Sequence, residues 1–310
     1  MTGLWQRWVD FTGRPMDTRP LALVRIFAAL CVLVDLLRLA QLRLVTFLFT
    51  PYEQGGLSQV QDSSWRLDEL LGPTVAGPVS YAVSLVCMAL IALGVAVRPA
   101  IVIGVLAYAQ LGHAYPPGDR AIDRVLRLTL LFLLFSQAHR RFALSNVLGW
   151  TKRLDTAPAW PADLIRSQLV MVYMAAGLSK IMQQPLWVAV TGTPVLYRIM
   201  TDPMAATLDP EAWEGAPWLF YAGGIGTIVL EVGAFVILTR LAPYWALLGL
   251  GMHLGIAMTM KLGMFSFGMM SLYPILLGAW ICAGLDRLGR RGGRWAALGR
   301  ATAEAPAPGR

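Results

Sequence analysis

The chain has 310 residues, of which 56% are hydrophobic and only 14% are charged, and its mean hydropathy is positive. Soluble globular domains carry roughly 25% charged residues, and disordered chains are polar and rich in charge, so the composition excludes both classes. One transmembrane helix needs about 20 apolar residues. The composition therefore predicts an all-α integral membrane protein surrounded by the lipid bilayer.

Apolar stretches in chain order predict about eight transmembrane helices, and proline or glycine residues separate several of them. The predicted helices cover residues 20–40, 75–97, 99–115, 121–137, 162–181, 218–239, 242–260 and 265–284. We expect a multi-span membrane domain over 20–285, a cytoplasmic N-terminal segment over 1–19 and a basic, disordered tail over 286–310. The proline-rich segment 182–217 predicts an irregular loop.

The net charge of +8 is explained by topology. With eight spans both termini share one side, and that side collects most of the loop arginines, whereas the acidic residues of 41–74 and 182–217 fall on the other. The positive-inside rule then predicts that both ends lie in the cytoplasm. We expect no nucleic-acid partner, because no basic run is interleaved with stacking aromatic residues.

The residue types of conventional catalytic and metal sites do not form their usual motifs. No HExxH, GxSxG, phosphate-binding loop or paired His/carboxylate spacing occurs, so we predict no metal. The cysteines Cys31, Cys87 and Cys282 lie in apolar runs without a CxxC pair and are expected to be small core residues.

Ionisable side chains inside the predicted spans cost about 2.5–3.5 kcal/mol each on insertion scales, so each needs a partner or a role. Spacings of three and four residues allow Asp35 to meet Arg38 and Asp123 to meet Arg127 on one helix face. Ion pairs that lock helices together explain these charges more simply than catalysis does. Glu231 has no local partner, so it should pair with an arginine of another helix or be protonated, and both structural and functional roles stay open. The residues expected in intramembrane ion pairs are Arg25, Asp35, Arg38, Asp119, Asp123, Arg127 and Glu231.

Lys180 is the most informative residue, because the chain contains 23 Arg and only three Lys. A desolvated lysine can lose its proton, whereas arginine does not. Lys180 lies near the outer end of an apolar helix and shares a helix face with Tyr173 and Gly177. A general base is one interpretation, and snorkelling of the amine to the outer interface is the other. The small Gly177 either opens a notch beside the amine or permits close helix packing.

Two histidines need separate interpretations. His253 lies in the middle of a glycine-rich apolar span, where a hydrogen-bonded core histidine is more common than a ligand or base. His139 precedes Arg140 and Arg141, and we expect it to be solvated.

The residues from Gln168 through Tyr173 and Gly177 to Lys180, followed by Trp187 and a TGTPVLY run, resemble the HTTM family. This family shares the membrane domain of the vitamin K-dependent gamma-carboxylases. Further matching stretches occur in the right order over about residues 18–285, and they include Arg25 with Asp35 and Arg38, Gly118-Asp119 with Asp123, His253, and the run from Lys261 to Met269.

The resemblance implies a carboxylase-like activity at the outer face of the membrane. In the carboxylases, the lysine that matches Lys180 deprotonates vitamin K hydroquinone, and the oxygenated product removes a glutamate γ-proton before CO₂ adds. By resemblance, Lys180, His253 and Tyr173 are expected to be catalytic. Trp187, Phe265 and Gly177 are expected to contact the cofactor, which would be reduced vitamin K or menaquinol, and a secreted peptide is the possible substrate.

The sequence also departs from the carboxylases. Asp119 stands where they carry a histidine, and the chain has a short basic tail where they continue into a large lumenal domain, as expected of a bacterial-type member in the inner cell membrane. One branch of the family resembles membrane proteins that help to mature secreted peptide toxins. A non-enzymatic protein that aids maturation or export of a secreted peptide is therefore the alternative.

Overall fold

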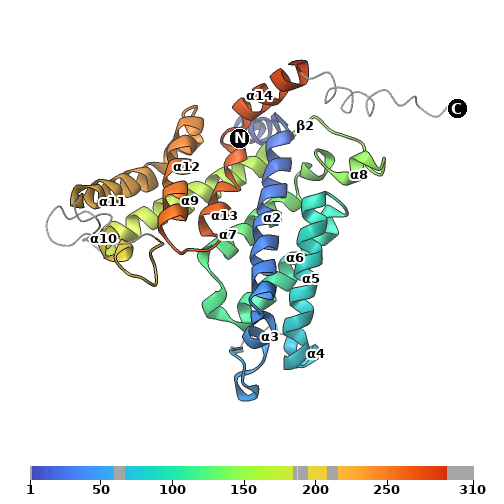
Figure 1. Cartoon of the computed structure of the whole chain (residues 1–310). Helices are drawn as coiled ribbons and strands as arrows, with labels where there is room; N and C mark the ends of the chain where they lie inside the picture. Colours follow the sequence, from blue (N-terminus) through green and yellow to red (C-terminus); the bar gives the residue numbers. More distant parts are fainter. Residues whose placement is uncertain (1, 59–66, 184–186, 188–194, 208–215, 292–310) are drawn as a thin grey trace.

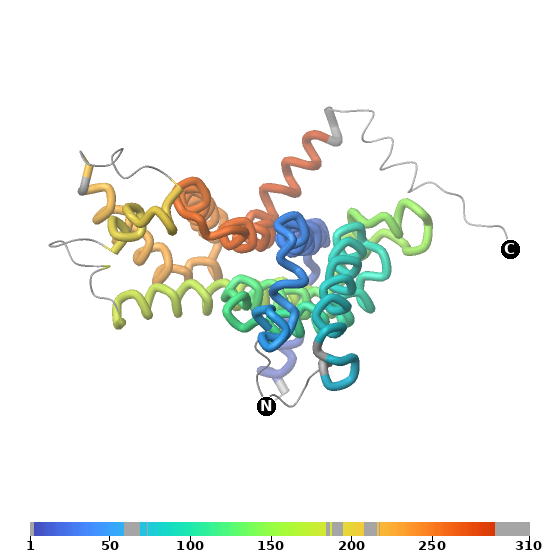
Figure 2. The backbone as a smooth tube through the Cα atoms, turned by 60° about the horizontal axis from the view of Figure 1, so that its bottom comes forward, coloured from blue at the N-terminus to red at the C-terminus, as the bar shows by residue number. Residues whose placement is uncertain are grey.

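Helix α2 (Arg19–Gln41) runs through the middle of the molecule (Figure 1). The computed structural model describes residues 2–58, 67–183, 187, 195–207 and 216–291, which are mostly helical. The hairpin of α5 (Pro73–Leu93) and α6 (Val97–Ala114) lies on one side of α2, and α11 (Pro217–Val232) and α12 (Ala242–Thr259) lie on the other. Figure 2 shows the same separation from another direction. Helix α2 therefore joins two groups of helices.

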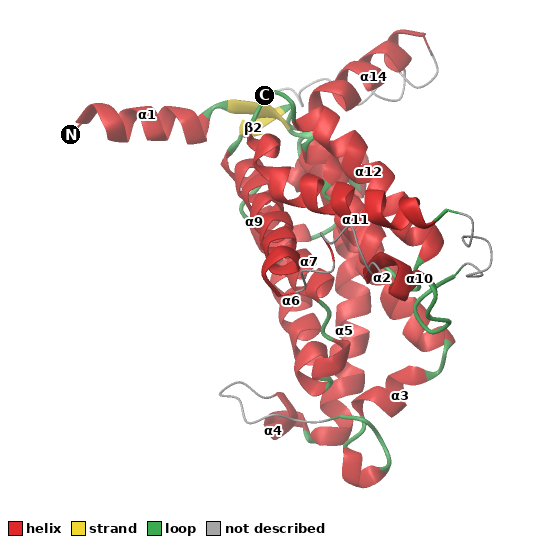
Figure 3. Cartoon of the chain, turned by 90° about the vertical axis from the view of Figure 1, so that its left-hand side faces the viewer, coloured by secondary structure: helices red, strands yellow, loops and turns green. Residues whose placement is uncertain are grey.

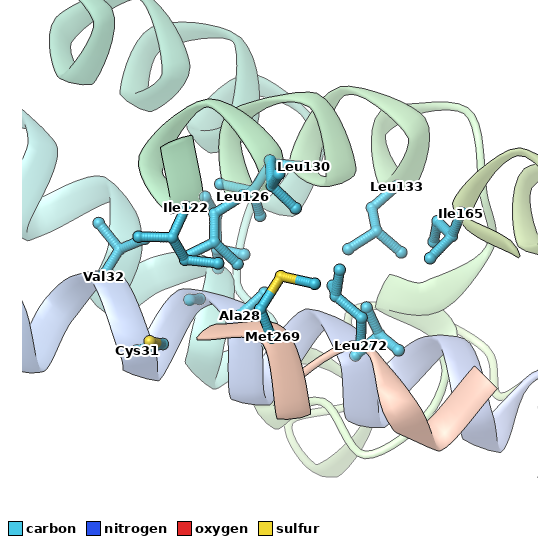
Figure 4. Close-up of a cluster of buried hydrophobic side chains, with 14 of the residues drawn as sticks. Ala28, Cys31, Val32, Ile122, Leu126, Leu130, Leu133, Ile165, Met269 and Leu272 are labelled. Atoms are coloured by element: carbon cyan, nitrogen blue, oxygen red, sulfur yellow. The ribbon is translucent and has the colours of Figure 1, made fainter. Parts of the chain in front are cut away.

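The apolar core forms where α2 meets α7 (Ala121–Leu134), α9 (Trp160–Gln183) and α13 (Phe265–Met270) (Figure 4). Leu130, Ile165 and Leu272 are completely buried there, and Met269 points into the same cluster. Lipid tails are as apolar as these side chains, so close packing holds such helices together rather than the exclusion of water.

The turn between α5 and α6 depends on Gly94, which has a φ of +77°. A Cβ atom at this position would collide with the Arg25 guanidinium and with Ala143. Glycine is the residue that adopts positive φ without strain, so Gly94 both ends α5 and lets α2 approach the turn.

Three helices among the described residues are long and apolar enough to cross a membrane: Arg19–Gln41, Thr74–Leu93 and Trp218–Leu238. A fourth crossing is reached if the bent pair Phe265–Ile275 and Gly278–Leu288 counts as one span. A helix lies in each of the eight predicted ranges. The structure thus supports an all-α membrane protein, while the number of eight crossings and the orientation stay predictions.

The last predicted helix, 265–284, is not continuous. The chain forms α13, the single turn η7 (Tyr273–Ile275) and α14 (Gly278–Arg291), with a bend of 75°. Pro274 lies in η7, after the end of α13 and before the bend, and proline has no N–H to continue a helix. The beginning of the predicted tail is also helical, because α14 reaches Arg291, and the tail from 292 onward lies outside the described residues.

The N-terminal segment is attached to the bundle. After α1 (Thr2–Gly13), strand β1 (Pro15–Asp17) pairs antiparallel with β2 (Thr156–Pro158). Arg14 adds two hydrogen bonds to the carboxylate of Asp163, at 2.7 and 2.8 Å. The predicted irregular loop 182–217 includes the end of α9, the short helix α10 (Val195–Met200) and the first residue of α11, and part of that loop lies outside the described residues. The remaining short elements are α3 (Leu44–Phe49), η1 (Tyr52–Gln54), α4 (Leu67–Leu71), η2 (Pro116–Gly118), η3 (Ala138–Arg140), α8 (Leu144–Val147), α10 (Val195–Met200) and η6 (Gly233–Leu238).

Candidate functional site

Lys180 and Glu231 form an ion pair between α9 and α11. The Lys180 Nζ atom donates hydrogen bonds to both Glu231 carboxylate oxygens, at 2.7 and 2.8 Å. The Glu231 side chain is 9% exposed and the Lys180 side chain 22%. The partner of Glu231 is therefore a lysine rather than the arginine, or the proton, that the sequence suggested.

Helix geometry explains why each charge needs the other. Lys180 lies in the last turn of α9, where the helix dipole favours a cation. Glu231 lies near the C-terminal end of α11, where the dipole disfavours an anion. The ammonium therefore offsets both the burial of the carboxylate and its place on the helix.

The ion pair borders an apolar cavity of about 1040 Å³. Lys180, Trp187, Glu231 and Phe265 line the cavity together with apolar side chains of α10, α11 and α12. The Lys180 Nζ atom also lies 5.4 Å from the centroid of the Trp187 ring, within the range of a cation–π contact. Of the predicted site residues, these four thus share one cavity.

Gly177 lies next to the ion pair but does not line the cavity. A Cβ atom on Gly177 would lie 2.9 Å from Val232 Cγ2 and 3.0 Å from Glu231 Cβ. The glycine therefore permits the close approach of α9 and α11, which was one of its two predicted roles. The space where a Cβ atom would lie is occupied by α11, and a cofactor contact of Gly177 stays a prediction.

Tyr173 and His253 meet in a buried cluster behind the cavity. The Tyr173 hydroxyl lies 2.7 Å from His253 Nε2 and 2.7 Å from the Tyr273 hydroxyl. The Tyr173 ring packs edge-on against Trp245, and the His253 ring lies 5.8 Å from Phe265. Trp245 and Phe265 also line the cavity, so these two rings separate the polar cluster from the cavity.

Tyr273 is a member of this cluster that sequence reasoning missed. It comes from η7, in the middle of the predicted last helix, and its ring is fully buried. A buried tyrosine hydroxyl usually finds a hydrogen-bond partner, so a Tyr-Pro pair inside an apolar segment was an available signal for a break and a polar contact.

The predicted ion pair between Asp35 and Arg38 is wrong. Asp35 instead pairs with Arg120, which precedes α7, and Arg38 is exposed. Arg120 also holds Asp123 at 2.9 Å, and the Tyr108 hydroxyl donates a 2.7 Å hydrogen bond to the same carboxylate. The planar guanidinium of Arg120, which has five N–H donors, thus binds carboxylates on two helices.

The predicted pair between Asp123 and Arg127 is also wrong. Arg127 binds Asp119 at 2.7 Å, and Arg124 binds the same carboxylate at 2.9 Å. Burial by itself would raise the pKa of Asp119, but the hydrogen bonds and charges of Arg127 and Arg124 outweigh it and lower the pKa. Asp119 is therefore a structural anion of the loop before α7.

Arg25 forms no ion pair with the residues that the structure describes. It is completely buried, and its guanidinium donates to the carbonyl oxygens of Ile91 at 2.9 Å, Phe142 at 2.7 Å and Arg141 at 3.3 Å. Its partners are thus carbonyls of a helix end and a loop, and the Ile91 carbonyl among them also accepts the Gly94 N–H. No pattern in the sequence indicates these contacts.

His139 is half-buried rather than solvated. Its burial and the nearby charges of Arg98, Arg140 and Arg25 lower its pKa to about 4. Within the described ranges, no group of three or more His, Cys, Asp and Glu side chains is placed to hold a metal ion.

Apolar helices long enough to cross a bilayer, with an ion pair at the wall of an apolar cavity, define a helical membrane protein. Residues 13–280 match the HTTM domain, so the chain belongs to the HTTM family. Comparison with curated proteins and with solved structures gave no match.

Proposed function

We propose that this protein is a membrane enzyme of the carboxylase-like type in which Lys180 removes a proton from a quinol bound in the apolar cavity. The observation that carries the proposal is the position of the Lys180–Glu231 pair at the wall of that cavity. Ligand and active sites are typically apolar pockets in which a few polar side chains converge, and this pair supplies such side chains.

The lining residues fit an amphipathic quinol. Ligand pockets commonly measure about 300–1,000 Å³ and are mostly apolar, and this cavity has a similar size. Leu230, Met252 and Ile256 offer an apolar wall for a hydrocarbon tail, while Lys180 and Glu231 offer a donor and an acceptor for a hydroxyl group. When bound, a quinol supplies an acidic hydroxyl and two reducing equivalents.

The ion pair must first release the amine before Lys180 can act as a base. Transfer of one proton from Lys180 Nζ to a Glu231 oxygen, over 2.7 Å, leaves a neutral amine and a neutral carboxylic acid. Lys180 then takes a proton from a hydroxyl placed in the cavity, and the ammonium that forms stabilises the negative charge left behind.

The arrangement of the chain supports a site in the outer half of the membrane. Helix α9 begins at Trp160, directly after strand β2, which pairs with β1 of the N-terminal segment. Lys180 lies at the other end of α9. We propose eight crossings in the inner cell membrane with both termini in the cytoplasm, in keeping with the positive-inside rule. The domain limits of 20–285 belong to this proposal.

The decisive experiment compares Lys180→Arg and Lys180→Ala in purified protein reconstituted with reduced vitamin K or menaquinol. The mixture contains dissolved O₂, which supplies the epoxide oxygen, and quinone epoxide is the product to be measured. We expect both variants to lose activity, because arginine keeps the charge but does not give up its proton. The matched control is Lys261→Ala, which removes an exposed lysine that contacts the Pro203 carbonyl. Retained activity in Lys180→Arg, or no epoxide from the unaltered protein, would contradict the proposal.

The second candidate is a non-enzymatic protein that binds a secreted peptide and aids its maturation or export. The observation in its favour is that both Glu231 carboxylate oxygens accept hydrogen bonds from Lys180 Nζ, so that the lysine is held in place by an ion pair. In that case Lys180 acts as a fixed cation, and Lys180→Arg preserves export of the peptide in cells while Lys180→Ala reduces it.

A further inference from the structure

Helix α1 carries an apolar face that the rest of the protein does not cover. Spacings of three, four and seven residues place its large apolar side chains on one side of the helix. All of them are exposed, and the rings of two tryptophans stack with their centroids 5.2 Å apart. We call this surface the aromatic face of α1, and its members are Leu4, Trp5, Trp8 and Phe11.

The opposite face of α1 is polar. Gln6 and Asp10 are joined there by a 3.0 Å hydrogen bond, and Arg7 lies beside them and is exposed. The helix is thus amphipathic over its 12 residues, although it does not pack its apolar side onto the bundle as a helix of a soluble protein would.

The direction of α1 is fixed by its attachment. The β1–β2 pair follows directly, and Arg14 binds both oxygens of Asp163 in α9. Arg14 also donates a 2.7 Å hydrogen bond to the Phe11 carbonyl at the end of α1. Figure 3 shows α1 pointing sideways from the end of the bundle, across the direction in which α2 and α5 run.

We propose that α1 lies flat in the boundary between the headgroups and the acyl chains of the membrane that α2 and α5 cross. A helix that points across two membrane-spanning helices lies in the plane of the bilayer. Tryptophan is enriched at that depth, and amphipathic helices bind there with their apolar face inserted. The occupant of the aromatic face is therefore lipid, and Arg7 on the other face lies within reach of lipid phosphates.

Photo-crosslinking in nanodiscs of phosphatidylcholine and phosphatidylglycerol tests this placement. The full chain carries p-benzoylphenylalanine in place of one α1 residue, and the adducts are identified by mass spectrometry. Trp5→p-benzoylphenylalanine and Trp8→p-benzoylphenylalanine probe the aromatic face. The matched controls on the same helix are Arg7→p-benzoylphenylalanine and Asp10→p-benzoylphenylalanine.

We expect acyl-chain adducts from positions 5 and 8 at several times the yield from positions 7 and 10. Equal yields from the two faces would mean that α1 does not lie at the boundary. Crosslinks from position 8 to a second copy of the chain would show that protein covers the aromatic face. Either result overturns the proposal.

Discussion

Lys180 and Glu231 stand 51 positions apart in the chain and meet with two hydrogen bonds across the contact of α9 with α11. Each charge makes the burial of the other tolerable, because an isolated charge in an apolar environment costs far more than a paired one. This relation makes it possible to separate the contribution of the pair to stability from its contribution to function.

The single variant Lys180→Met should destabilise the protein, whereas the double variant Lys180→Met with Glu231→Met should recover most of the loss. We expect the single change to cost about 2 kcal/mol, less than is usual for a fully buried pair, because Lys180 keeps 22% exposure. Thermal unfolding in detergent micelles measures both. A double variant as unstable as the single one would refute this account, and a double variant that regains activity would refute the proposed proton transfer.

Replacement of Gly177 by alanine should separate α9 from α11. The added Cβ would lie 3.1 Å from the Val232 backbone nitrogen and 3.0 Å from Glu231 Cβ, and backbone atoms do not move aside easily. The control is Gly226→Ala on α11, where a Cβ meets nothing within 4 Å and alanine favours the helix. We expect Gly177→Ala to lower the melting temperature and Gly226→Ala to leave it unchanged or raise it. The same effect from both would contradict the close approach.

Tyr173→Phe should cost more stability than Tyr273→Phe. The Tyr173 hydroxyl takes part in both hydrogen bonds of the cluster, whereas the Tyr273 hydroxyl takes part in one of them. Loss of the shared hydroxyl leaves His253 Nε2 buried without this partner, and an unsatisfied buried polar group costs about 1–3 kcal/mol. Chemical unfolding of the two variants gives the comparison. If Tyr273→Phe proves the more damaging, the cluster is organised around another residue.

The sequence identified residues that stand out by type, and it missed the pairings that depend on which helices are neighbours. Lys180 and His253 are rare residue types within apolar spans, so both could be selected without a structure. Glu231 was recognised as lacking a local partner, but only the packing of α9 on α11 shows that Lys180 fills this role. Helix geometry allows residues three or four apart to pair, yet Asp35 lies closer to Arg120 across the α2–α7 contact than to Arg38 on its own helix.

Arg120→Gln should be far more harmful than Arg124→Gln, although both remove one positive charge near the start of α7. Arg120 holds Asp35 and the nearly buried Asp123, while Arg124 is 68% exposed and binds Asp119, which keeps Arg127. We expect the free energy of unfolding to fall by about 3 kcal/mol in Arg120→Gln and by less than about 1 kcal/mol in Arg124→Gln. Equal losses in thermal unfolding would show that the charges near the start of α7 act only through their sum.

His139 should make the protein less stable as the pH falls. Its pKa is about 4 in the folded chain, against an ordinary value of 6.5, so the unfolded chain binds more protons between these two values and stability decreases there as acid is added. His139→Gln removes this contribution. When the pH is lowered from 6.5 to about 4, we expect the melting temperature of the variant to fall less than that of the unaltered protein. An unchanged difference would mean that folding does not lower the pKa of His139.

The carbonyl oxygens that Arg25 contacts have a consequence for the order of assembly. The first partner, Ile91, follows Arg25 by 66 positions, and the last, Phe142, follows by 117. During synthesis from the N-terminus, helix α2 therefore carries a guanidinium without its final acceptors until nearly half of the chain has been made. A bare charge in the bilayer is costly, so we expect α2 to reach its final position only after α5, α6 and α7 have joined it.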